Sequence, residues 1–112
     1  MGVTLATVRR IALALPETTE APHHDMTSFR VKGKIFATVP PDGTRIHVFV
    51  DDEELDSYCT EFPHAVEELW WGARRRGCRV VLRQAPASVV RELLELSWRG
   101  KAPKQLVSEL GP

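Results

Sequence analysis

Apolar residues recur at the spacing of a helix that buries one face in several parts of the chain. The pattern predicts helices over Thr4–Leu15, Asp51–Phe62, Pro86–Trp98 and Lys104–Leu110. Pro16 stops the first helix, and Pro86 opens the third at its first helical position, with Gly100 closing it. Asp51 and Glu54 stand three residues apart, as in a capping box, at the start of the second helix.

Between the first two helices, apolar and polar residues alternate as they do in half-buried strands. Thr27–Val31 and Lys34–Val39 flank Lys32-Gly33, whose glycine supplies the positive φ that a tight hairpin turn requires. A second turn over Pro40–Thr44 leads to a third strand, Arg45–Val50. These segments predict a three-stranded antiparallel meander.

Two other segments are less regular. Pro16–Met26 holds two prolines, two threonines and a His-His-Asp cluster, and is predicted to be a loop. His64–Gly77 suits a helical turn as well as a strand. Taken with the strand-like Arg79–Arg83, Leu69–Ala73 predicts a second hairpin with its arginines in the turn. The sequence therefore predicts a single α+β domain over residues 1–112, with an antiparallel sheet packed on helices.

Composition narrows the class of protein. Fifteen Lys and Arg balance fifteen Asp and Glu over 112 residues, which excludes a uniformly basic nucleic-acid binder but not a polarised one. No apolar run approaches the ~18 residues of a membrane span. Cys59 and Cys78 lack a CxxC spacing, so they make neither a disulfide framework nor a zinc site. We expect a cytoplasmic protein, monomeric, without a membrane contact or a cofactor.

The balanced charge conceals a segregation along the chain. Asp51–Glu68 contains eight acids and no Lys or Arg, whereas Arg74–Lys104 contains nine bases and two acids. The first hairpin adds three bases, Arg30, Lys32 and Lys34, around its turn. Both predicted hairpin turns are therefore basic, and turns of this kind are exposed to solvent.

Several blocks of the sequence occur together in one known family. The first half contains Arg9, Leu13 to Pro16 and the run Thr27-Ser28-Phe29-Arg30-Val31-Lys32-Gly33-Lys34-Ile35-Phe36-Ala37. The second half contains Trp71-Gly72, Gly77, Leu94, Ser97-Trp98-Arg99 and Ala102-Pro103-Lys104. Over nearly its whole length the chain resembles the MmcQ/YjbR family of small bacterial proteins, with Cys78 where that family usually has Trp. The resemblance implies a CyaY-like fold with two hairpin wings, described as DNA-binding chiefly because of that double-wing shape.

Weak, largely sequence-nonspecific DNA binding is the leading functional hypothesis. The predicted nucleic-acid-binding residues, which would neutralise phosphates, are Lys32, Lys34, Arg74, Arg75, Arg76 and Arg79. If the second hairpin serves a partner, its three consecutive arginines should be exposed and unpaired with Asp51–Glu61; ion pairs there would favour a structural role. Two other classes stay open: a protein-interaction module using the segregated charges, and a small-ligand site in a cleft beside His23-His24-Asp25.

The remaining candidate sites have plainer explanations. His23, His24 and Asp25, with His64, are metal-ligand types, but adjacent histidines rarely point the same way and no second ligand motif supports them. The acids of Asp51–Asp56, which invite comparison with iron-binding frataxin, are explained by capping and helix-dipole complementarity. Four potential nucleophiles lack a visible base partner, so no enzyme activity is expected: Ser28, Cys59, Cys78 and Ser97. Two of the three tryptophans are expected to pack in the core.

Overall fold

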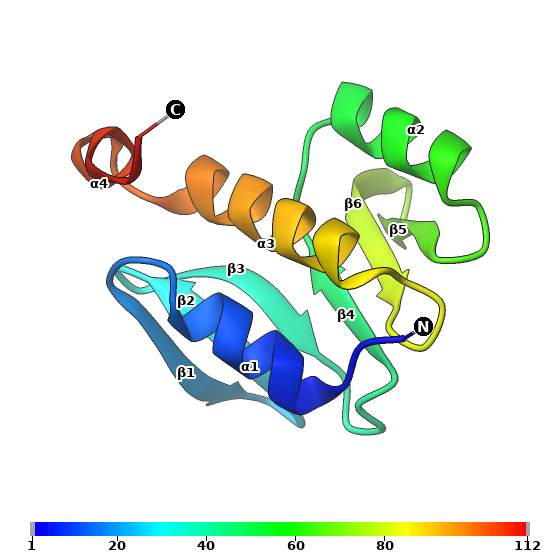
Figure 1. Ribbon diagram of the computed structural model, residues 1–112, viewed down its shortest axis with the longest axis horizontal. Helices are drawn as coiled ribbons and strands as arrows, with labels where there is room; N and C mark the ends of the chain where they lie inside the picture. Colours follow the sequence, from blue (N-terminus) through cyan, green and yellow to red (C-terminus); the bar gives the residue numbers. More distant parts are fainter. Residues whose placement is uncertain (1, 112) are drawn as a thin grey trace.

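The computed structural model describes residues 2–111, which form a six-stranded antiparallel sheet and four helices (Figure 1). In chain order the elements are α1 Leu5–Leu13, β1 Thr18–His23, β2 Met26–Val31, β3 Lys34–Val39, β4 Arg45–Val48, α2 Asp52–Glu61, β5 Val66–Trp71, β6 Arg74–Val81, α3 Ala87–Lys101 and α4 Lys104–Leu110. The strand order is β1-β2-β3-β4-β6-β5. Figure 1 shows α1 and α3 on one face of the sheet, with α2 beside β5 and β6 and α4 beyond the end of α3.

The predicted α+β class, the β2–β3–β4 meander and the helices are confirmed. At the start of α2, Asp51 accepts a hydrogen bond from the Glu54 backbone N–H at 2.9 Å. Lys32 and Gly33 have φ values of 48° and 81° in the turn between β2 and β3, as a tight hairpin turn demands. Helix α3 differs at both ends: Pro86 is its N-cap, and the helix continues through the exposed Gly100 to Lys101.

The prediction of a loop over Pro16–Met26 is wrong, because most of this segment is the edge strand β1. It pairs with β2 along its full length, from Thr18 opposite Val31 to His23 opposite Met26. An edge strand needs no strong apolar alternation, and it tolerates a proline such as Pro22, since one row of its backbone groups has no strand partner. The sequence signal was therefore weak where the pairing is regular.

The second hairpin is confirmed, but its turn is misplaced in the prediction. Strand β5 begins at Val66, the turn consists of Gly72 and Ala73, and the three arginines that follow lie in β6. Because they belong to a strand, successive arginines point to opposite faces of the sheet. That alternation decides which of them is available to a partner.

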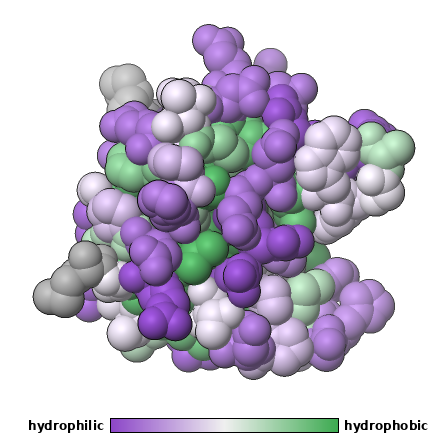
Figure 2. All heavy atoms as spheres, turned by 90° about the vertical axis from the view of Figure 1, so that its right-hand side faces the viewer, coloured by the Kyte–Doolittle hydropathy of each residue, from purple (hydrophilic) through white to green (hydrophobic). Residues whose placement is uncertain are grey.

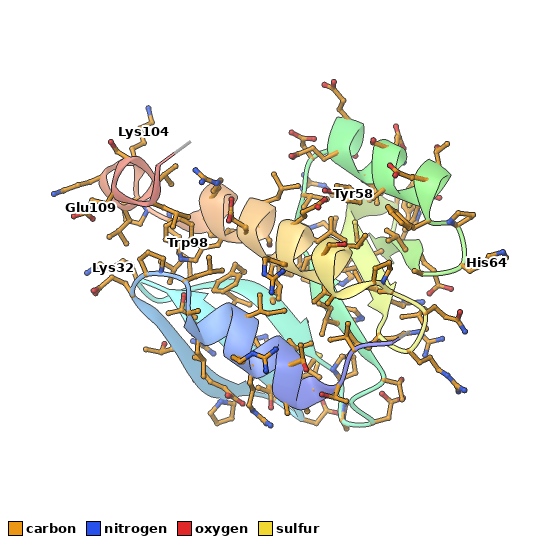
Figure 3. All side chains as sticks on the ribbon, in the orientation of Figure 1. Lys32, Tyr58, His64, Trp98, Lys104 and Glu109 are labelled. Carbon is orange, nitrogen blue, oxygen red and sulfur yellow. The ribbon has the colours of Figure 1, made fainter. Side chains whose placement is uncertain are left out.

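The core lies between the sheet and the helix layer. Trp98 of α3 is fully buried there, and its indole N–H donates to the Pro16 carbonyl at 3.1 Å. Figure 3 shows its side chain between α3 and the strands. The indole therefore attaches α3 to the chain that leaves α1, while its polar N–H keeps a hydrogen-bond partner.

A single buried serine joins two strands that have separated. Strands β3 and β4 are paired only at Ala37–Val48 and Thr38–His47. Beyond these pairs, the Ser97 hydroxyl accepts from the Phe49 N–H at 2.9 Å and donates to the Phe36 carbonyl. Since both hairpin turns lie at this end of the sheet, the separation lets the β2/β3 hairpin diverge toward α4 and the β5/β6 hairpin toward α2 (Figure 1).

Candidate functional site

One face of the sheet has no helix packed on it within residues 2–111, and we call it the open face. The registers place one row of side chains across its six strands: Ala21, Ser28, Thr38, His47, Arg79 and Glu67. In the alternate row, Phe29, Ala37 and Val48 are buried on the helix side of the sheet. The open face therefore carries the polar half of the strand pattern.

Positive charge collects on the open face of the second half of the sheet. Arg79 and His47 are opposite each other in the β4–β6 ladder, and Arg45 lies two residues before His47 on the same face. Burial, together with the charges of Arg79 and then Arg45, lowers the pKa of His47 below its usual value. The nearby acid, Glu67, lies 3.8 Å from the Arg45 Nε. Arg45 and His47 are not among the predicted site residues, although their alternation with Ile46 and Val48 in the sequence already places them on the face away from the core.

The three consecutive arginines are divided between the two faces. Arg75 points to the helix side, where its guanidinium contacts the carboxylates of Asp52, Asp56 and Glu68 at 3.1, 2.9 and 2.7 Å. These bonds raise its pKa above the usual value. The expectation that all three arginines are unpaired with the acidic helix is therefore wrong for Arg75.

Arg74 and Arg76 have no ion pair within residues 2–111. Arg74 is exposed, and the Arg76 guanidinium carbon lies 5.2 Å from the centre of the Trp71 ring. Arg79 is also free of an ion pair in this part of the chain. Three of the predicted cations, Arg74, Arg76 and Arg79, therefore lie on the open face without an ion pair in this part of the chain. Arg75 instead forms ion pairs with Asp52 and Asp56 of α2.

The turn of the first hairpin is less strongly basic than the sequence suggests. Lys32 Nζ lies 3.2 Å from a carboxylate oxygen of Glu17, and both side chains are more than half exposed. Lys34 is exposed and has no ion pair within residues 2–111. Figure 3 shows Lys32 at the end of the molecule where α4 lies. This turn and the arginines of β6 therefore form two separate basic areas.

Two of the three tryptophans are exposed, which corrects the expectation that two would be buried. Trp70 and Trp71 are 52% and 51% exposed.

The ladder between β5 and β6 shifts between Leu69 and Trp70, so that Arg76 is an extra residue in β6, a β-bulge. Gly77 beside this bulge approaches Val48 so closely that a Cβ would lie 2.1 Å from the Val48 oxygen, which explains the glycine. The bulge leaves Trp71 and Arg76 together on the open face.

A cleft lies between the two hairpins, and we call it the interhairpin cleft. It encloses about 170 Å³. Its lining comes from five parts of the chain: His23 and Met26, Ile35 and Thr38, Phe49, Trp71 and Arg76, and Lys101. Phe49 and Trp71 meet edge to face with ring centres 5.7 Å apart. The sequence suggested a cleft beside His23. It gave no indication of the lining residues far from His23 in the chain, which are Phe49, Trp71, Arg76 and Lys101.

The other candidate chemistry gains no support from the geometry. No group of three or more His, Cys, Asp or Glu side chains within residues 2–111 is placed to hold a metal ion. His64 lies in the loop between α2 and β5 (Figure 3). Burial raises the pKa of the Cys59 thiol and raises that of Cys78 to about 12, so both favour the unreactive thiol form at neutral pH.

The end of the molecule formed by α2, β5 and β6 presents a mixed surface. Figure 2 shows it as mostly hydrophilic, with hydrophobic areas that are small and separated. No helix within residues 2–111 is long and apolar enough to cross a membrane.

These features define a single α+β domain in which helices cover one face of an antiparallel sheet and two hairpins diverge at one end. Residues 13–100 match the model of the YjbR family, and the chain belongs to that family. No curated protein matches the sequence.

A solved structure supports the fold independently. The crystal structure of the Deinococcus radiodurans protein DR2400, with a DUF419 domain, is similar to this chain with a TM-score of 0.76 and 24% sequence identity. The similarity covers 96% of this chain and 88% of the other. At this identity the comparison establishes the shared architecture.

Proposed function

We propose that this protein is a non-enzymatic DNA-binding protein that contacts phosphates through the open face, weakly and with little sequence preference. The observation that carries the proposal is the division of charge by strand alternation. Arg74, Arg76 and Arg79 lie on the open face without ion pairs within residues 2–111, while Arg75 faces the acidic helix α2. Over β4, β5 and β6 the open face thus presents more positive than negative charge, although Glu67 lies among these cations.

The position of α2 reduces the repulsion between the acidic segment and DNA phosphates that the sequence suggests. Eight acids in Asp51–Glu68 would repel phosphates if they faced the same way as the arginines. Helix α2 packs on the other side of β5 and β6, and Arg75 forms ion pairs with Asp52, Asp56 and Glu68 there, whereas Glu67 stays on the open face. The zero net charge still limits the affinity, so binding is expected in the ~10⁻⁴–10⁻⁶ M range of nonspecific complexes.

The experiment measures fluorescence anisotropy of random-sequence duplex DNA at several salt concentrations. Each phosphate neutralised contributes about 0.9 to the slope of log K against log salt, so Arg74→Ala/Arg79→Ala should lower that slope by about 1.8. The matched control is Arg10→Ala/Arg91→Ala, which removes the same charge from exposed positions on α1 and α3. The control should leave the slope unchanged.

Three results would contradict the proposal: no binding at low salt, an unchanged slope in Arg74→Ala/Arg79→Ala, or an equal loss in both double variants. An equal loss would mean that only overall charge matters. Absence of DNA binding would favour the alternative of a protein partner that recognises the separated acidic and basic surfaces. Circular dichroism of each variant confirms that the sheet is intact.

A further inference from the structure

A buried hydroxyl without a partner lies in the interhairpin cleft. Thr38 is 4% exposed, and its Oγ1 has no hydrogen-bond partner within residues 2–111. The neighbouring hydroxyl in the same cross-strand row, Ser28 Oγ, donates to the Ala21 carbonyl at 2.7 Å and accepts from the Arg30 guanidinium at 3.0 Å. Since buried polar groups are ordinarily satisfied, the Thr38 hydroxyl requires an explanation that Ser28 does not.

Two cations border the same cleft, and aromatic rings hold both of them. Lys101 Nζ lies 5.4 Å from the centre of the Phe49 ring, and the Arg76 guanidinium lies over Trp71. Neither cation has an ion pair within residues 2–111, and no Asp or Glu lines the cleft. Cation–π contacts place a positive charge without neutralising it, so both charges remain available to an anion.

The rest of the lining suits an apolar, planar body. Trp71 and Phe49 provide ring surface, and Ile35 and Met26 provide aliphatic surface. A volume of about 170 Å³ corresponds to five or six water molecules at ~30 Å³ each. It lies below the ~300 Å³ at which pockets for larger ligands begin. The space within the cleft is large enough for a single substituted ring.

We propose that the interhairpin cleft binds a small aromatic carboxylate, with its ring between the apolar walls, its carboxylate near Arg76 and Lys101, and a polar substituent or carboxylate oxygen on Thr38. The binding depends on groups from both hairpins and from the end of α3. The cleft shares Arg76 with the proposed DNA contacts, whereas Thr38 and Lys101 lie outside them.

The test titrates benzoate into the protein and follows amide shifts by NMR, with acetate and benzyl alcohol as probes that lack the ring or the charge. Benzoate should shift Thr38, Phe49 and the Trp71 indole at concentrations where neither control does. Lys101→Met should weaken benzoate binding about tenfold, whereas Lys104→Met, an exposed lysine three residues further on, should leave it unchanged. DNA binding should be unchanged in the Lys101→Met variant, because Lys101 is not among the proposed DNA contacts. This measurement therefore tests the DNA proposal separately from the ligand proposal.

A second variant separates ligand binding from folding. Thr38→Val removes an unpartnered hydroxyl at nearly constant volume, so it should preserve or raise the urea midpoint while weakening benzoate binding about fivefold. The proposal is overturned if benzoate produces no localised shifts, if acetate binds equally well, or if Thr38→Val binds benzoate as tightly as the unmodified protein.

Discussion

Replacing Ser97 with alanine tests how the two halves of the sheet are held together. The Ser97 hydroxyl bonds both to the Phe49 N–H and to the Phe36 carbonyl, and Ser97 and Phe36 are fully buried. The substitution leaves those two backbone groups without partners, because β3 and β4 are already too far apart there to pair. A buried unsatisfied group costs about 1–3 kcal/mol, so the free energy of unfolding should fall by about 2–4 kcal/mol.

Urea denaturation followed by tryptophan fluorescence measures this loss. With a slope of ~1.5 kcal/mol/M for a domain of this size, the midpoint should fall by about 1.3–2.7 M. Ser88→Ala, at an exposed position of the same helix, is the matched control and should change stability by less than ~0.5 kcal/mol. A loss below about 1 kcal/mol in Ser97→Ala would refute the reasoning, since it would mean that the strands re-pair or that water satisfies both groups.

Two further predictions concern titratable side chains. The folded pKa of His47 lies below its ordinary value of 6.5, so the unfolded chain takes up the proton first as the pH falls. The stability of the folded protein should therefore decrease as the pH drops through 6.5. In an NMR titration, the His47 pKa should also rise with salt, because salt screens the charges of Arg79 and Arg45. A folded pKa above 6.5 would contradict the assignment. The Cys78 thiol, with its pKa raised to about 12 by burial, should not react with a thiol reagent such as DTNB in the folded protein, and should react once urea unfolds it. Rapid modification of the native protein at Cys78 would show that the strand opens there.

The sequence predicted those parts of the fold whose signals are local. The capping residue Asp51, the Lys32-Gly33 turn and the alternation in β4 act over a few neighbouring positions, so they appear in the sequence. Strand β1 did not, because its pairing with β2 stabilises it more than its own apolar residues do. The site was harder to predict than the fold.

The sequence indicated which basic residues could form the candidate site, but it did not indicate how they are arranged in space. The sequence singles out the arginines of β6 as a basic cluster, but their division between two faces depends on the strand position and on one bulge. The interhairpin cleft joins Thr38, Trp71 and Lys101, which lie at least thirty positions apart and on three different elements. No local pattern brings such residues together; only the divergence of the two hairpins does.

The extra residue in β6 determines how Arg74, Arg75 and Arg76 are divided between the two sides of the sheet. Without the extra residue, the alternation of side chains along β6, counted back from Cys78, would place Arg75 on the open face. Arg74 and Arg76 would then point toward the carboxylates of α2. The bulge reverses this phase and transfers one net positive charge from the helix side to the open side. Among related sequences, the number of residues between the hairpin turn and this strand position is therefore as informative as the number of arginines, because an odd change in spacing would exchange the sides on which these arginines lie without altering the composition.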